Sequence, residues 1–104
     1  MKTVLYNDFE SDQALLDKDI ILKSHPKGIQ TKFLRLIKDI LTNPRNKNTI
    51  GKPEQLKHTD IEKWSRELTK KDRIVYAIVP GSNYGLEVPE VVVFIQYLGH
   101  YDDK

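Results

Sequence analysis

The sequence has 104 residues, which is enough for one domain with a single hydrophobic core. Its composition is 38% hydrophobic and 31% charged, which excludes wholesale disorder, and the lack of cysteine excludes disulfides and thiolate metal sites. No apolar stretch approaches the length of a membrane span, and the start MKTVLYNDFES lacks the apolar region of a signal peptide. We therefore expect a cytoplasmic protein that makes no membrane contact.

The net charge of +2 is unevenly distributed along the chain. Residues 1–52 hold ten Lys/Arg and six Asp/Glu, a charge of +4, whereas residues 53–104 hold seven and nine, a charge of −2. This distribution indicates a local basic patch rather than overall basicity. The patch consists of Arg45, Lys47, Lys52 and Lys57, and it suits either a solvated loop or a contact with nucleic acid.

The first half of the chain predicts one strand and two helices. Alternation in Met1–Tyr6 predicts a short strand, after which Asn7 or Asp8 is expected to cap a helix whose end is marked by Ser24-His25-Pro26. A second helix is predicted over Lys27–Thr42, and Asn43-Pro44 ends it. The expected core-facing residues are Phe9, Leu15, Leu16 and Ile20 in the first helix, and Ile29, Phe33, Leu36, Ile37, Ile40 and Leu41 in the second.

The second half predicts strands. A polar loop over Arg45–Pro53 precedes strands at Trp64–Leu68, Arg73–Val79 and Val91–Leu98, with a turn cluster after the second of them. The order β-α-α-β-β-β indicates an α+β domain over residues 1–104: a small antiparallel sheet, with mixed pairing left open at the first strand, and both helices on one face. The other face of such a sheet is free for chemistry.

The chemically active residue types suit phosphodiester cleavage better than other reactions. The histidines lack metal-ligand spacing, and the sequence has neither a GxSxG nucleophile motif nor a glycine-rich phosphate loop. RNA can be cut without a metal if a base removes the 2′-hydroxyl proton, an acid protonates the leaving 5′-oxygen and a cation holds the phosphate. Glu54, Arg73 and His100 supply these three types.

Each of these residues also has a structural explanation. Glu54 follows Pro53 in a polar stretch and suits a solvated loop, whereas Arg73 suits a charge at a strand edge. His100 and Tyr101 suit the end of a strand, although an aromatic ring there could also stack on a base. Composition and spacing alone leave these alternatives open.

Several motifs together resemble the YoeB/Txe toxins, within the RelE-type group of toxin–antitoxin systems. They are GKPEQLKH at 51–58, WSREL at 64–68, DRIVYAIV at 72–79 and GHYDDK at 99–104, and their order and spacing also fit. The resemblance implies a toxin that cleaves mRNA in the ribosomal A site, needs no metal or other cofactor, and leaves a 2′,3′-cyclic phosphate. It also implies a cognate antitoxin of the YefM/Phd type or a similar one, and it is compatible with a homodimer.

The resemblance also assigns residue roles. It implies Glu54 as the general base, Arg73 as the phosphate clamp and His100 as the general acid, with Tyr101 beside the scissile phosphate. It further implies RNA or phosphate contacts by the cationic residues Lys52, Lys57 and Arg66. Two other functions remain open: a ribosome- or RNA-binding module that blocks translation without cutting, and an interaction partner that acts only with the antitoxin in transcriptional autoregulation.

Overall fold

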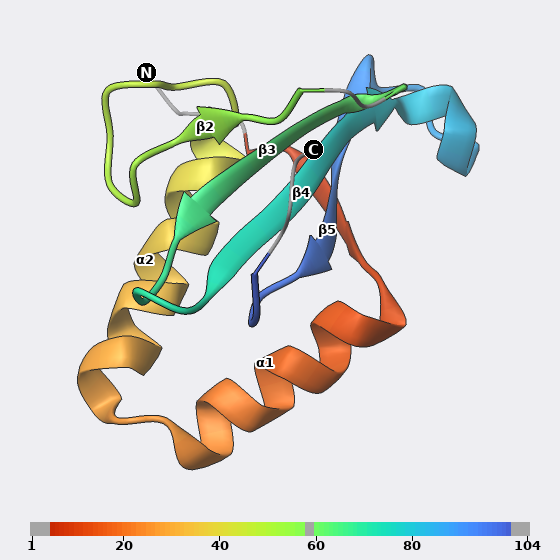
Figure 1. Ribbon diagram of the computed structural model, residues 1–104. Coiled ribbons are helices and arrows are strands. Elements are labelled where there is room, and N and C mark those ends of the chain that lie inside the picture. Colours follow the sequence, from red (N-terminus) through yellow and green to blue (C-terminus); the bar gives the residue numbers. More distant parts are fainter. Residues whose placement is uncertain (1–4, 58–59, 101–104) are drawn as a thin grey trace.

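The structure, a computed structural model, describes residues 5–57 and 60–100 and consists of two helices and a sheet (Figure 1). The sheet has five strands in the order β1-β5-β4-β3-β2, in which β1 runs parallel to β5 and all other neighbours are antiparallel. The elements are β1 Asn7–Glu10, α1 Asp12–Ser24, α2 Lys27–Thr42, β2 Glu54–Gln55, β3 Glu62–Glu67, β4 Arg73–Pro80, a 3-10 turn η1 Gly81–Tyr84 and β5 Glu90–Gln96.

The predicted fold class is confirmed. Both helices pack on one face of a mixed sheet, and the core between them contains Phe33, Leu36 and Ile40 of α2 against buried side chains of β3, β4 and β5. The expected stripe of α2 is correct because its period of about 3.6 residues places these side chains on one side. Within the described ranges, neither helix has the length and apolar character that a membrane crossing requires.

The prediction for the first strand and its helix cap was wrong in position. Strand β1 lies at Asn7–Glu10 and pairs with Val91–Phe94, whereas residues 1–4 of the predicted strand lie outside the described ranges. The N-cap of α1 is Ser11, whose Oγ accepts a hydrogen bond from the backbone N–H of Ala14. Asn7 and Asp8 are already part of the strand, so they do not cap the helix.

The predicted core stripe of α1 was also wrong. The buried residues of this helix are Ala14, Asp17 and Ile21, whereas Leu15, Leu16 and Ile20 are 46%, 62% and 47% exposed. Helix α1 has apolar residues on several sides, so periodicity alone gives no clear core-facing side. The side that faces the sheet carries a carboxylate in its centre.

The face of the sheet opposite the helices is divided into two parts. Over β5 and the end of β4, a small cluster of Ala77, Val79 and Val91 is covered by partly buried apolar side chains. The rings of Phe9 and Tyr84 stack there with centroids 4.1 Å apart, so η1 covers this part. Toward β2 and β3, the same face carries polar and charged side chains.

Candidate active site

The strand register brings residues from four strands, three of them polar, into one row on the open face. Glu54 of β2 lies opposite Ser65 of β3, Ser65 lies opposite Val75 of β4, and Val75 lies opposite Gln96 of β5. Directly paired residues project to the same face of a sheet, so these four side chains share the face that the helices leave free. Arg73 of β4, two residues before Val75, projects from that face as well.

Arg73 is held at the centre of this group. Its Nε and Nη2 donate hydrogen bonds to the hydroxyl oxygen of Ser65 at 3.0 and 2.9 Å, and its Nη2 lies 4.0 Å from a carboxylate oxygen of Glu54. Ser65 is 1% exposed, so its hydroxyl is a fixed acceptor, while the Arg73 side chain keeps 23% of its surface accessible. The guanidinium is therefore oriented but still reachable by an anion.

Sequence reasoning missed Ser65. The signal available was its position between Trp64 and Arg66, since alternation along a strand turns Ser65 away from those two neighbours and toward the open face.

Gly51 fixes the path of the chain into β2. Its carbonyl accepts the N–H of Glu67 at 2.6 Å, and its φ of 84° lies in the left-handed region that favours glycine. A Cβ atom at this position would lie 2.6 Å from Leu36 Cδ2 and 3.1 Å from Arg66 Cβ, so the chain packs against both α2 and β3 here. Lys52 also has a left-handed backbone, with φ 47°, and its Nζ lies 3.7 Å from the Glu67 carboxylate. Strand β2 begins two residues later at Glu54.

The chain after β5 returns to Arg73. The backbone N–H of Arg73 donates to the Gly99 carbonyl at 3.0 Å, and the Gly99 N–H donates to Asp72 Oδ1 at 2.9 Å. His100 follows directly and is exposed, so the backbone brings the predicted acid to the end of β4 that carries the predicted phosphate clamp. The fourth predicted catalytic residue, Tyr101, lies outside the described ranges.

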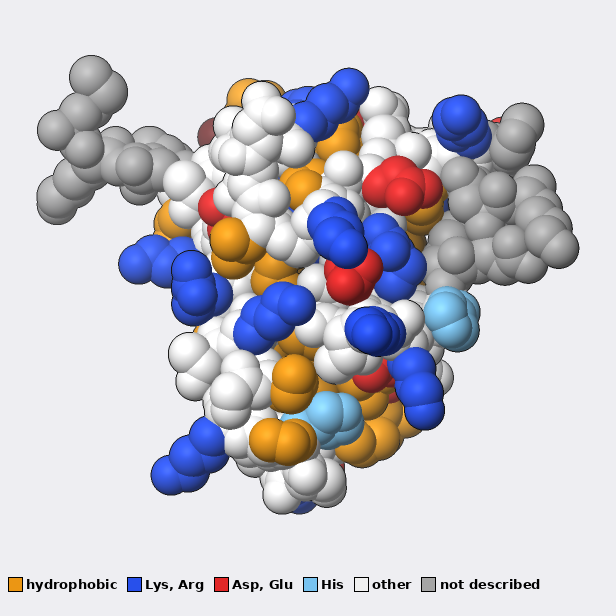
Figure 2. Space-filling model, turned by 60° about the vertical axis from the view of Figure 1, so that its left-hand side comes forward, with side chains coloured by type: hydrophobic (Ala, Val, Ile, Leu, Met, Phe, Trp, Pro, Cys, Tyr) orange, Lys and Arg blue, Asp and Glu red, His pale blue; other side chains and the backbone are white. Residues whose placement is uncertain are grey.

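A hollow of about 510 Å³ lies beside Glu54. Lys47 and Trp64 both line it, and Lys47 Nζ lies 5.9 Å from the centroid of the Trp64 ring, a distance that allows a cation–π contact. We call Lys47, Lys52 and Lys57 the basic segment. On the side of the molecule that includes α2 and β2, Lys and Arg side chains outnumber acidic ones (Figure 2). The hollow is lined by Lys47, Pro53, Glu54, Gln55, Leu56, Lys57 and Trp64.

Arg66 does not join this site. Its side chain is fully buried on the helix side of β3, where Nη1 binds Asp39 Oδ2 at 2.6 Å and the Ile50 carbonyl at 3.2 Å. The predicted phosphate contact does not fit this placement, because no phosphate can reach a guanidinium that is enclosed between α2 and the sheet. Arg66 instead ties β3 to α2 and to the loop before β2.

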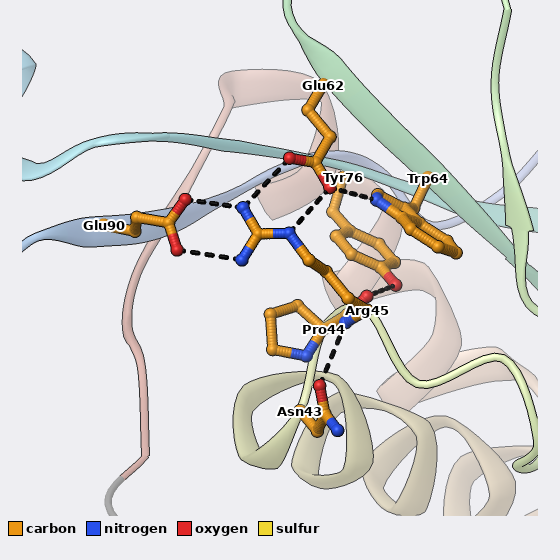
Figure 3. Close-up of polar contacts among 7 residues, drawn as sticks. All are labelled: Asn43, Pro44, Arg45, Glu62, Trp64, Tyr76 and Glu90. Atoms are coloured by element: carbon orange, nitrogen blue, oxygen red, sulfur yellow. Dashed lines mark hydrogen bonds and ion pairs between the residues drawn. The ribbon is translucent and has the colours of Figure 1, made fainter.

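Arg45, at the start of the predicted basic patch, is part of a structural network (Figure 3). It donates hydrogen bonds to both carboxylate oxygens of Glu62 on β3 at 2.9 Å, and it also binds Glu90 on β5. These hydrogen bonds lower the pKa of both carboxyl groups. Trp64 Nε1 donates to Glu62 at 2.7 Å, and the hydroxyl of Tyr76 donates to the Pro44 carbonyl at 2.7 Å. The loop that leads to Lys47 is thus anchored at its start.

Among the described residues, no group of three or more His, Asp or Glu side chains is arranged to hold a metal ion. What the site does offer is a carboxylate and a guanidinium at one edge of the open face, with His100 following directly on the Gly99 backbone that contacts Arg73.

Comparisons with known proteins identify relatives of the chain. Residues 11–101 match the model of the YoeB-like toxin of bacterial type II toxin-antitoxin systems. The toxin YoeB of Escherichia coli (strain K12) is 43% identical over 56 residues, which is 54% of this chain and only 64% of that relative's length.

Two solved structures extend the likeness to nearly the whole chain. A YoeB/ParE toxin from Agrobacterium tumefaciens has a TM-score of 0.72 at 24% identity, covering 91% of this chain and 99% of that one, and it supports the fold alone. A heterotetrameric YoeB-YefM toxin-antitoxin complex from Staphylococcus aureus contains a chain with a TM-score of 0.67 at 26% identity, covering 92% and 98%. The family model spans most of the sequence, and on that ground the chain belongs to the YoeB-like toxins of bacterial type II toxin-antitoxin systems.

Proposed function

We propose that this protein is a ribosome-dependent endoribonuclease that cleaves mRNA without a metal ion and thereby inhibits translation. The observation that carries the proposal is the placement of Arg73: its guanidinium is oriented by Ser65, lies 4.0 Å from the Glu54 carboxylate, and sits beside the backbone segment that leads into His100. A base, a phosphate-binding cation and an acid at one edge are what metal-free RNA cleavage requires.

The reaction assigns one task to each residue. The Glu54 carboxylate takes the proton of the 2′-hydroxyl, and the resulting 2′-oxygen attacks the adjacent phosphorus. Arg73 binds the non-bridging oxygens, on which negative charge accumulates in the transition state. The bond from phosphorus to the 5′-oxygen breaks, and the protonated imidazole of His100 gives its proton to that oxygen. The products are a 2′,3′-cyclic phosphate and a free 5′-hydroxyl end. Tyr101 is proposed to lie beside the scissile phosphate.

The basic segment and the hollow support an RNA substrate. Lys52 is 81% exposed in its side chain, so it can approach a phosphate. The hollow is partly open, which suits an enzyme whose substrate is held by the ribosome. When the ribosome positions the mRNA, the enzyme does not need a deep specificity pocket. We propose a cytoplasmic location, where the ribosome is available.

We further propose a cognate antitoxin of the YefM type as the physiological partner, by likeness to the Staphylococcus aureus complex. An inhibitor segment that folds on binding can cover a large surface of so small a toxin. A homodimer is proposed on the family resemblance and can be tested by light scattering.

Primer extension on mRNA after expression of the toxin alone tests the central proposal. We expect discrete new 5′ ends with the wild type and none with Glu54→Gln, since the amide keeps the size of the side chain but does not act as a base. Glu54 is 64% exposed, so this change should leave the fold intact. Translation arrest without new 5′ ends would favour a non-cleaving ribosome-binding module, and no arrest at all would favour a role with the antitoxin only.

A further inference from the structure

Side chains of α1, of β5 and of the turn before β4 hold the chain just beyond β5, and the one from α1 is a buried carboxylate. Pairing of β5 with β4 ends at Gln96, so the N–H groups of Tyr97 and Leu98 need other acceptors. Both donate to one oxygen of Asp17, Oδ2, at 3.0 and 3.1 Å. We propose that Asp17 is a positioning residue for the proposed cleavage reaction, because it sets the path of the segment that ends in His100.

The burial of Asp17 shows that its carboxylate has a specific task. The residue is 4% exposed and lies between Ala14 and Ile21 on the one side of α1 that faces the sheet. A buried carboxylate is unfavourable unless hydrogen bonds satisfy it, whereas an apolar side chain at this position would leave the N–H groups of Tyr97 and Leu98 without this acceptor. Here it accepts three hydrogen bonds, two from the chain after β5 and one from Gln13 Nε2 at 2.8 Å. The buried carboxylate thus serves as the hydrogen-bond acceptor for the backbone that leads to the site.

Helix α1 and its N-cap contact this stretch of chain at two successive points. Ser11, at the start of the helix, binds the carbonyls of Phe94 and Ile95 through its N–H and its hydroxyl, at 2.9 and 2.6 Å. Asp17, nearly two turns further along, binds the N–H groups of residues 97 and 98. Helix α1 and its N-cap therefore hold both the end of β5 and the residues that follow it; Figure 1 shows where these elements lie.

The far end of the segment is fixed from the opposite side. Gln96 Nε2 donates to the carbonyls of Leu98 and Gly99 at 3.1 and 3.2 Å, and Asp72 accepts the Gly99 N–H at 2.9 Å. The Arg73 N–H donates to the Gly99 carbonyl at 3.0 Å. With Asp17 removed, these contacts still tether Gly99, but the two residues before it lose their acceptor. The direction in which His100 leaves the sheet then becomes variable.

The inference rests on the proposed function, and single-turnover cleavage on programmed ribosomes tests it with three variants. Asp17→Ala removes the acceptor, Asp17→Asn keeps an acceptor oxygen, and Asp19→Ala is the matched control on an exposed part of the same helix. We expect Asp17→Ala to lower the maximal single-turnover rate by about 10- to 100-fold, with little change in the protein concentration that gives half of this rate, because a small misplacement of a catalytic group carries a loss of this size. Asp17→Asn should stay within about threefold of wild type, and Asp19→Ala should match wild type.

Amide hydrogen exchange provides a readout that does not depend on activity. In the wild type, the amides of Tyr97 and Leu98 should be protected like those in the centre of β5, such as Val92. In Asp17→Ala, their exchange should accelerate while that of Val92 stays unchanged. A destabilised domain would instead accelerate all three.

The outcomes separate this inference from the proposed function. If the wild type does not cleave, the proposed function fails, and exchange still decides whether Asp17 holds the segment. If the wild type cleaves and folded Asp17→Ala cleaves equally well, the positioning role is overturned. If Asp17→Ala does not fold, the decision rests on Asp17→Asn and on the wild-type amides: rapid exchange of Tyr97 and Leu98 in the wild type would overturn the inference.

Discussion

Replacing Arg73 by alanine should abolish most of the proposed cleavage activity while leaving the fold in place. The ion pair with Glu54 spans 4.0 Å, and Glu54 is 64% exposed, so its loss should change the free energy of unfolding by no more than about 1 kcal/mol. The two hydrogen bonds from the guanidinium to the buried Ser65 hydroxyl add about 1.5–3 kcal/mol more. A domain of ordinary stability, about 5–15 kcal/mol, stays folded after such a loss.

The effect on the reaction should be larger. Losing one preoriented electrostatic donor costs about 2–4 kcal/mol of transition-state stabilisation, which corresponds to a rate loss of about 30- to 900-fold. Single-turnover cleavage of mRNA on programmed ribosomes measures this rate, and urea unfolding measures the stability of the same sample. Arg35→Ala, on an exposed position of α2, removes the same charge away from the site and should change neither value appreciably.

Two results would refute this reasoning. A rate loss below about tenfold, or about 1.4 kcal/mol, would show that Arg73 does not hold the phosphate. An equal loss in Arg35→Ala would show that overall positive charge, rather than the oriented guanidinium, supports the reaction. Loss of structure in Arg73→Ala would instead contradict the small stability contribution derived from its exposed partner.

Three other perturbations test separate parts of the structure. His100→Gln removes the proposed acid and should slow cleavage by about 10²- to 10⁴-fold while antitoxin capture persists in a pull-down; near-wild-type cleavage would move the acid role elsewhere. Changing all three lysines of the basic segment to glutamine should weaken ribosome association more at low than at high salt, measured by co-sedimentation, and an equal loss at every salt concentration would indicate a non-electrostatic contact. Arg45 holds the pKa of Glu62 and Glu90 below the ordinary value, so its contribution to stability is present above the ordinary carboxyl pKa and is lost as pH falls through the lowered values. Arg45→Met should therefore lower the free energy of unfolding by about 1–2 kcal/mol at pH 7, with the difference from wild type shrinking in acid; a difference that does not depend on pH would assign the loss to packing.

Sequence patterns predicted the parts of the fold that depend on local periodicity. Helix α2 has a clear 3.6-residue repeat and a proline stop, so both its bounds and its buried residues were predicted correctly. Strand β1 could not be located in this way, because Asn7–Glu10 contains residues that disfavour strands and is extended through pairing with β5, more than 80 residues away. Local propensity carries no information about that partner.

The candidate site was likewise predicted only in part. Family motifs led to Glu54, Arg73 and His100, but they gave no account of what orients the guanidinium. Alternation in β3 turns Ser65 to the open face, but only the register of β3 with β2 and β4 shows that it lies beside Glu54 and Arg73. Arg66 illustrates the opposite error. Strand alternation places it on the same side as Trp64 and Leu68, and this physical signal should have outweighed the expectation of a phosphate contact.

The position of β5 inside the sheet has a consequence for folding. Strand β5 is the last strand to be synthesised, yet it lies between β1 and β4, so β1 gains a partner only after about 80 intervening residues have emerged from the ribosome. Helices α1 and α2 and the β3–β4 hairpin have short-range contacts and can form earlier, whereas closure by β5 is a long-range and slow event. The segment that carries His100 follows β5, and it reaches Arg73 only after this closure. The topology therefore delays assembly of the proposed cleavage site until the end of folding.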